Sequence, residues 1–214
     1  MNTKTNKIGY VAAMDSSNSE VTGGIDAFAL GVYSVNPDAQ IYVKVTNSWY
    51  SPEAEKAAAA TLLDMNCDVI TQHCDTLYPQ TLAQERGVYS IGYNSDMSKE
   101  APAACLCSVI WNWSAYYTAA VQSIIDGTWD GSNYYGGMNE NLVDITSLAS
   151  FCKEGTAEKV EEARKQILSG EIGVFDGEME TNEQTTVGKA GSTLDDATIT
   201  GGIDWYFKTV QIVE

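Results

Sequence analysis

The sequence predicts an α/β protein in which helices cover both faces of a parallel β-sheet. Short apolar runs typical of buried strands alternate with segments of helical periodicity along the first 126 residues. Such alternation favours parallel strands, because right-handed crossover connections place the helices on the faces of the sheet. The length of 214 residues suits one domain or two small lobes.

Each expected element has a local signal. Strands are predicted at residues 7–14, 40–46, 67–72, 88–93 and 104–110, and helices at 19–35, 52–65, 77–86 and 114–126. Pro52 fits the first turn of its helix, and Gly127 ends the helix before it. The last third differs, with one strong helix at about 155–169 and weak strands near 172–187 and 203–212.

Composition excludes several classes of protein. Twelve basic and 29 acidic residues give a net charge of −17, which repels phosphate backbones, so we do not expect a nucleic-acid partner. No apolar run reaches the ~20 residues of a membrane span. Five cysteines without C-x-x-C spacing indicate free, buried thiols rather than a disulfide framework or a zinc site. We therefore expect neither a metal nor a cofactor.

Polar and aromatic residues follow every predicted strand, at the sheet edge where α/β proteins bind ligands. The candidate binding residues are Asp15, Asn47, Trp49, Tyr50, His73, Asp75, Thr76, Ser95, Asp96 and Trp111. Aromatic rings offer flat faces, and the polar side chains offer directed hydrogen bonds. These loops hold neither a glycine-rich phosphate cradle nor a cation before Lys99. A neutral, flat, polar ring compound fits them best.

Structural roles remain open for the same residues. Trp49, Tyr50 and Trp111 could pack at the rim or in the core. Asp75 or Thr76 could cap the third helix, and Asp96 could serve a turn. The His73-x-Asp75 pair also permits a metal ligand or a general base, but it is a weak signal. No G-x-S-x-G elbow accompanies the single histidine, so we do not expect an enzyme.

Seven blocks occur in order along the chain: KIGYVAAMDSS, FALGVYSVNPDAQ, NSWYSPEAE, DVITQHCDT, YSIGYNSDMS, SVIWNWSAYY and IIDGTWDG. Together they resemble the basic membrane protein (PnrA-like) family of ABC-transporter substrate-binding proteins, which includes purine nucleoside receptors. The resemblance covers residues 7 to about 175. It implies capture of a purine nucleobase or nucleoside for an ABC permease, without catalysis.

The resemblance also implies a type I periplasmic-binding-protein fold, in which two lobes close on the ligand. The family's purine-stacking aromatic falls on Trp49 and its ligand-binding carboxylate on Asp96, with His73 and Asp75 at the cleft. The lysine of nucleoside receptors falls near Trp111. This departure weakens the inference of ribose binding and leaves a free base, or another ring, as the ligand.

The same resemblance predicts the domain organisation. Residues 1–110 would form the second lobe, 111–140 a hinge and a helix of the first lobe, and 141–214 a helix and terminal strands that return to the lobes. Since the first lobe and an export signal would precede residue 1, we expect a C-terminal fragment of an extracytoplasmic parent that is periplasmic or lipid-anchored. Alternatives are the effector-sensing domain of a regulator or, less favoured, a small hydrolase.

Overall fold

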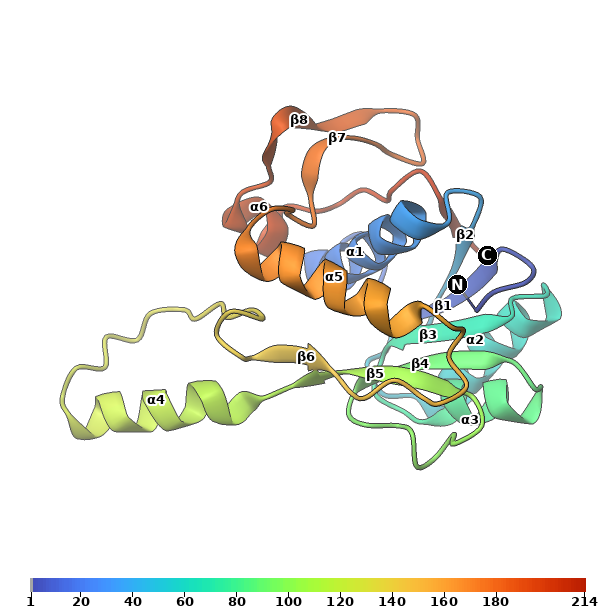
Figure 1. Ribbon diagram of the computed structural model, residues 1–214, viewed down its shortest axis with the longest axis horizontal. Coiled ribbons are helices and arrows are strands. Elements are labelled where there is room, and N and C mark those ends of the chain that lie inside the picture. The colour runs from blue at the N-terminus through green and yellow to red at the C-terminus, as the bar shows by residue number, and fades with distance from the viewer. Residues whose placement is uncertain (1) are drawn as a thin grey trace.

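A seven-stranded sheet forms the centre of the protein in the computed structural model, which describes residues 2–214 (Figure 1). Its strand order is β6-β5-β4-β3-β1-β2-β9. The strands are β1 (Lys7–Ala12), β2 (Gln40–Val45), β3 (Val69–His73), β4 (Tyr89–Asn94), β5 (Cys105–Trp111), β6 (Val143–Ile145) and β9 (Val210–Ile212). Only β6 runs antiparallel to its neighbour within this sheet, so the predicted parallel sheet is confirmed.

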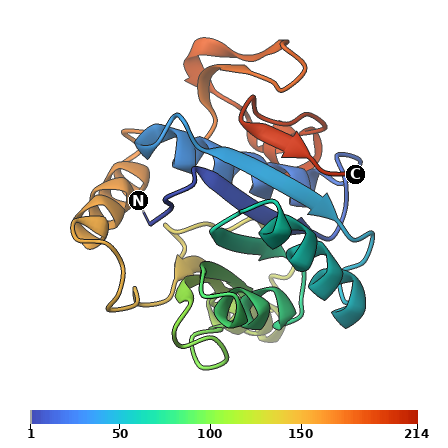
Figure 2. The same ribbon diagram turned by 90° about the vertical axis from the view of Figure 1, so that its right-hand side faces the viewer.

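Helices lie on both faces of the sheet, as predicted (Figure 2). They are α1 (Ser19–Val35), α2 (Pro52–Asp64), α3 (Tyr78–Glu85), α4 (Trp113–Ile125), α5 (Thr156–Ser169) and the short α6 (Asp196–Gly201). Successive residues of β1 face opposite sides, because side chains alternate along a strand. A side chain at Gly9 would meet Leu62 of α2, whereas the Tyr10 hydroxyl lies beside Gly24 of α1.

The helices begin where the sequence supplies caps. The Asn18 side chain accepts a hydrogen bond from the Val21 amide at the start of α1. The Ser51 side chain does the same for Ala54 in α2, where Pro52 occupies the first turn. These caps fix the direction in which α1 and α2 leave the loops that follow β1 and β2.

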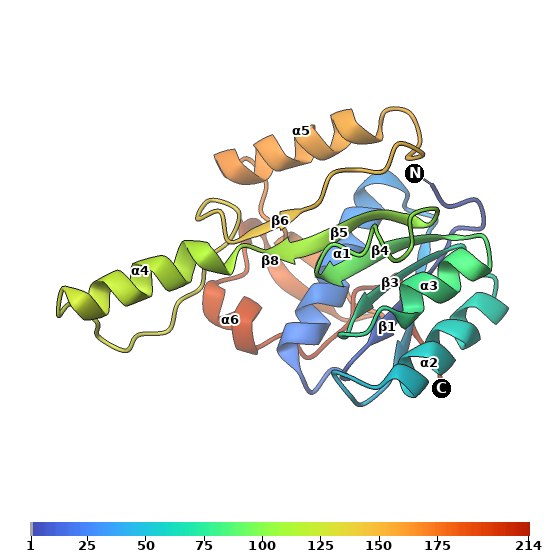
Figure 3. The same ribbon diagram turned by 90° about the horizontal axis from the view of Figure 1, so that it is seen from below.

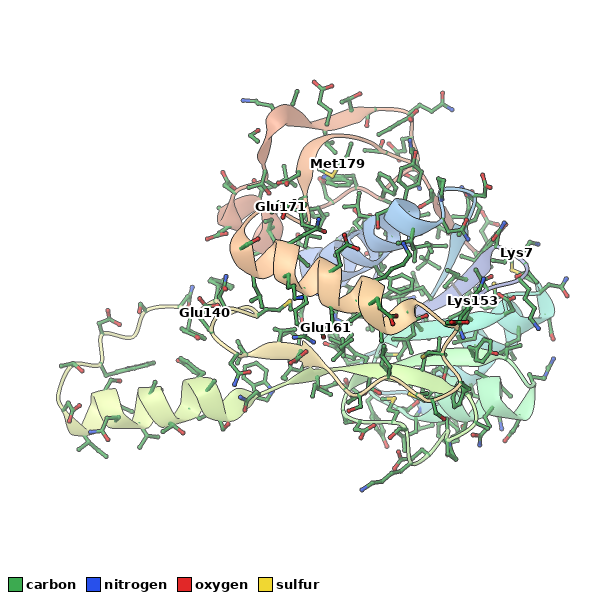
Figure 4. The ribbon with its side chains drawn as sticks, viewed as in Figure 1. Lys7, Glu140, Lys153, Glu161, Glu171 and Met179 are labelled. Atoms are coloured by element: carbon green, nitrogen blue, oxygen red, sulfur yellow. The ribbon has the colours of Figure 1, made fainter. Side chains whose placement is uncertain are left out.

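The C-terminal third contains elements that the sequence did not predict. Strand β6 extends the sheet beyond β5, and α6 contacts α1. The weak strand expected near 172–187 becomes β7 (Asp176–Glu180), which pairs with the unpredicted β8 (Thr186–Thr193) in a separate hairpin, whereas the one expected near 203–212 becomes β9 of the main sheet. This hairpin is anchored by Met179, which is buried beneath it in the main core (Figure 4).

All five cysteines are free, as predicted. Cys67, Cys74 and Cys105 are buried, whereas Cys107 and Cys152 are only half-buried. Burial raises the pKa of the Cys67 thiol to about 12, with a similar value for Cys107. Since the thiolate is the reactive form, these side chains act as small apolar groups at neutral pH.

Helix α4 extends away from the sheet and none of its residues is buried (Figures 1 and 4). Its sequence, WSAYYTAAVQSII, contains no charged residue. Tyr117, Val121, Ile124 and Ile125 are all more than half exposed. A contiguous apolar surface of this kind is unusual on a soluble chain unless another structure covers it. No helix among residues 2–214 combines the length and the hydropathy needed to cross a bilayer.

Asp26 of α1 is a fully buried carboxyl group that joins α1 to the segment before β9. Its Oδ1 accepts a hydrogen bond from the Phe207 amide at 2.8 Å, whereas Oδ2 has no partner among the described residues. Burial raises the pKa of Asp26 to about 8, and the Phe207 amide offsets only part of that rise. The fold therefore favours the protonated acid.

We expect the Asp26→Asn variant to gain stability relative to the unsubstituted protein as the pH rises from 4 to 8. The unfolded chain loses this proton near the ordinary pKa of 3.8, whereas the folded protein keeps it until about pH 8. The difference in free energy of unfolding should grow by a few kcal/mol over this range and then level off. Urea unfolding at several pH values measures it, with the exposed Asp38→Asn as control; a constant difference would contradict the prediction.

Candidate ligand-binding edge

The strand order places a topological switch point between β1 and β3. From β1 the chain moves to β2 on one side, then returns past β1 to β3 on the other. Ala12 and His73, the last residues of β1 and β3, are paired, and the Ala13 amide donates to the His73 carbonyl. Ligands of open α/β sheets bind beyond the carboxyl ends of the strands at such a point.

Aromatic side chains from three different loops and strands gather around His73. The Trp49 ring lies 5.7 Å from the His73 ring, edge to face, and the Tyr93 ring lies 4.5 Å from it on another side. The Tyr10 hydroxyl is 3.5 Å from His73 Nδ1. The predicted convergence of Trp49 and His73 is therefore present, with two tyrosines that the sequence did not single out.

The His73 imidazole is neutral at physiological pH. Burial lowers the pKa of His73 to about 4, because the charged form would lose its hydration. Helix α1 closes over this ring, and an added Cβ at Gly24 would lie 2.7 Å from His73 Nδ1. A neutral, fixed imidazole has one nitrogen that donates and one that accepts, and it adds no positive charge to the site.

Further aromatic residues lie at the end of β5 and in α4, the helix into which β5 leads (Figure 3). Burial raises the pKa of Tyr93 to about 12, and Trp111, the last residue of β5, acts to lower it. The Trp111 ring stacks on Trp113 with centroids 5.6 Å apart, and Trp113 stacks on Tyr117 at 5.8 Å. Trp111 is half-buried, so it combines the packing and rim roles considered for it.

The polar candidates lie on the exposed rim of this cluster. The Asp75 amide donates to the Trp49 carbonyl at 2.9 Å, and Asn94 Nδ2 donates to the Asp75 carboxylate at 3.4 Å. Asp15 and Asp96 each accept hydrogen bonds within their own turns, from Ser17 and Ser98. These bonds lower the pKa of both carboxyl groups. Exposed Asn47, Tyr50 and Ser95 complete the rim.

Thr76 lies beneath the rim rather than on it. Its side chain is buried, and its hydroxyl donates to Glu55 Oε2 at 2.7 Å. The same hydroxyl accepts from the amide of Tyr78, the first residue of α3, at 3.3 Å. The N-cap residue of α3 is Leu77, which makes no side-chain cap, so neither Thr76 nor Asp75 caps the helix as predicted; Thr76 contacts only its first amide, and Asp75 forms no such bond among the described contacts.

Three residues around the site had no clear signal in the sequence. Tyr93 and Tyr10 lie within strands, where an aromatic residue is ordinarily taken as core packing. Glu55 lies in a helix whose other glutamate, Glu53, is exposed. The Ser51-Pro-Glu-Ala-Glu sequence could have indicated that Glu55 reaches back to the start of the helix.

The two hollows described on the surface do not lie at this edge. One lies beside the β7–β8 hairpin and the other along α5, and neither contains a candidate binding residue. Among residues 2–214, no group of three histidine, cysteine or acidic side chains is arranged to hold a metal ion. The described residues of the site present aromatic ring faces and hydrogen-bonding side chains. They include no nucleophile and base arranged as a catalytic pair.

A family model described as ABC transporter substrate-binding protein PnrA-like matches residues 1–178. The chain belongs to this PnrA-like family. Since the family consists of substrate-binding proteins, the prediction that the chain is not an enzyme is confirmed. The resemblance derived from the seven sequence blocks is confirmed as well.

Relatives of this PnrA-like chain carry different ligand names. It is 36% identical to a purine-binding protein of Brucella abortus, covering 90% of this chain and 54% of that protein. It is 34% identical to a candidate ABC transporter glucose-binding protein of Haloferax volcanii, covering 83% of this chain and 45% of that protein. The chain thus spans about half the length of these relatives.

Solved structures support the fold of this family member. An ABC transporter solute-binding protein of Conexibacter woesei superposes with a TM-score of 0.64 at 19% identity. The match covers 78% of this chain and 56% of that one. At this identity, the similarity establishes the shared α/β fold and leaves the ligand open.

Proposed function

We propose that this chain forms one wall of the cleft in which an ABC importer's substrate-binding protein captures a purine base or nucleoside. The observation that carries the proposal is the cluster of Trp49, His73 and Tyr93 at the switch point of the sheet. A relative that shares 36% of the sequence is named a purine-binding protein, which supports the same ligand class.

The chemistry of the edge suits a purine better than an anion. A purine has a flat face for Trp49 and polar edges for carboxylates such as Asp75 and Asp96. A stacked base contributes roughly 1–3 kcal/mol, and hydrogen bonds at its edges give direction. None of the ten candidate residues is cationic, and His73 is held neutral by burial. A phosphorylated ligand would therefore find no opposite charge here.

The first lobe of this fold would supply the other wall of the cleft. In this proposal residues 1–110 form the second lobe, residues 111–140 form a hinge and a helix that belongs to the first lobe, and residues 141–214 return to both lobes. The uncharged, exposed face of α4 supports this division, because it would be covered on assembly. Closure of two lobes buries the ligand and presents the complex to a permease outside the cytoplasm.

Titration of the 214-residue chain with adenine, adenosine, guanosine and glucose tests the ligand class. With one wall only, we expect purines to bind weakly, with Kd values on the order of 0.1–10 mM, because a two-sided site loses several kcal/mol when half is missing. Glucose should bind at least tenfold more weakly than adenine. Equal binding of glucose, or saturation by glucose alone, would overturn the proposal; calorimetry or ligand-observed NMR gives the measurement.

A further inference from the structure

Glu55 is a fully buried carboxylate that forms no ion pair among the described residues. It lies near the start of α2, and its two oxygens are occupied by groups from two loops. Oε1 accepts a hydrogen bond from the Ser51 amide at 3.1 Å. Oε2 accepts from the Thr76 amide at 3.0 Å and from the Thr76 hydroxyl at 2.7 Å. Such charge-assisted bonds are the strong ones, and a charge buried without them is costly.

These bonds connect the two loops that carry the aromatic candidates. Ser51 lies two residues after Trp49, and Thr76 lies three residues after His73. Between them, the Asp75 amide donates to the Trp49 carbonyl at 2.9 Å. Glu55 is thus a side-chain bridge that joins the same two loops as this backbone bond, and these loops carry the Trp49 and His73 rings that meet edge to face.

The surroundings of Glu55 allow little freedom. Beside Thr76, the Gln72 side chain donates to the carbonyls of Cys74 and Thr76 at 2.8 and 2.7 Å. Gln80 of α3 in turn donates to Gln72 Oε1 at 2.8 Å. A connected, buried polar network of this kind favours a single arrangement of its members, because any unpaired group would be costly.

We propose that Glu55 is the positioning residue that holds Trp49 against His73. Its carboxylate fixes the loop after β2 to the loop after β3 through three hydrogen bonds of defined geometry. In this proposal Thr76 contributes to the site by donating hydrogen bonds to Glu55, and it does not contact the ligand. The role of Glu55 in ligand affinity rests on the proposed function, whereas its role in loop geometry does not.

Comparison of Glu55→Gln with Glu53→Gln tests the proposal. Glu53 is exposed two residues earlier in α2, so its variant makes the same chemical change without the bridge. In Glu55→Gln an amide NH₂ replaces an oxygen that accepts from backbone donors. We expect the Asp75 amide to exchange with solvent at least about tenfold faster, and the 5-fluorotryptophan signal of Trp49 to shift. The Glu53→Gln signals should match those of the unsubstituted chain.

A double-mutant cycle with Trp49→Ala then separates positioning from general destabilisation. Glu55→Gln should weaken adenine binding by about tenfold when Trp49 is present, and by less than about twofold when Trp49 is replaced. An equal loss in both backgrounds would overturn the proposal. So would Asp75 exchange and a Trp49 signal that match Glu53→Gln.

A second variant and two measurements that need no ligand keep a failure to fold, a failure to bind adenine and a failure of the Glu55 proposal distinct. If Glu55→Gln does not fold, Glu55→Asp retains the charge but shortens the side chain, so that it cannot reach Ser51 and Thr76 together; the same two signals should change. If adenine does not bind the unsubstituted chain, the proposed function fails, while the exchange rate and the fluorine signal still decide the role of Glu55.

Discussion

Replacing Gly24 with alanine should destabilise the protein by about 1–2 kcal/mol and displace the His73 ring, although alanine is the better helix former. The new Cβ would lie 2.7 Å from His73 Nδ1 and 2.9 Å from Cε1 of the same ring. His73 cannot simply retreat, because Tyr10 and Tyr93 pack around it. Overpacking a buried position costs roughly 1–3 kcal/mol, which exceeds the ~0.5–1 kcal/mol gained in helix propensity.

Gly31 provides a matched control on the same helix. No atom lies within 4 Å of an added Cβ at Gly31, and this residue is exposed. Gly31→Ala should therefore stabilise the protein by about 0.5–1 kcal/mol. Thermal or urea unfolding measures both variants, and the His73 ring resonances report the displacement. If Gly24→Ala stabilises as much as Gly31→Ala and leaves these resonances unchanged, the packing of α1 on the site is wrong.

Trp49→Ala should weaken adenine binding by about five- to 150-fold, which corresponds to the roughly 1–3 kcal/mol of one stacked base. Trp49 is half-buried and projects from a loop that two neighbouring hydrogen bonds hold in place, so its ring face is presented at little entropic cost. The Trp49→Ala variant keeps His73 and Tyr93 at the edge but loses the indole ring, which is the largest aromatic surface of the three.

Trp129→Ala is the appropriate control for this change. Trp129 is 46% exposed and follows α4, outside the loops that carry the binding candidates. Its replacement removes the same side chain and should leave the Kd for adenine within about twofold, because surface positions away from a site contribute little. Equal affinity of Trp49→Ala and the unsubstituted chain would remove Trp49 from the site.

Sequence patterns predicted the first two thirds of the fold well, for identifiable reasons. Strands β1 to β5 and helices α1 to α5 begin and end within two residues of their expected positions. Residues such as Asn18, Ser51 and Pro52 mark helix starts through local bonds that do not depend on the rest of the chain. Trp49 and His73 could be placed at one edge because they follow parallel strands, whose carboxyl ends share that edge.

Other features depend on contacts that local patterns do not encode. Strand β6 has only three residues, and it is defined by pairing with Val109, Ile110 and Trp111 of β5. The role of Glu55 arises because α2 passes beneath the loop at Thr76, which follows a different strand. The local sequence could indicate the bond from Glu55 to the Ser51 amide, but nothing within the helix indicates its bonds to Thr76. Tyr93 joins the cluster for the same reason, since β4 pairs with β3 and brings its ring to His73.

The most direct test of the central claim is an amide chemical-shift map of the 214-residue chain during titration with adenine. If the carboxyl edge binds the ligand, the largest changes will lie in residues 47–50, 73–76 and 94–96, and the Trp49 indole signal will move with them. Changes centred instead on the hollow beside the β7–β8 hairpin, which is lined by Tyr33, Gln184 and Lys208, would contradict the account.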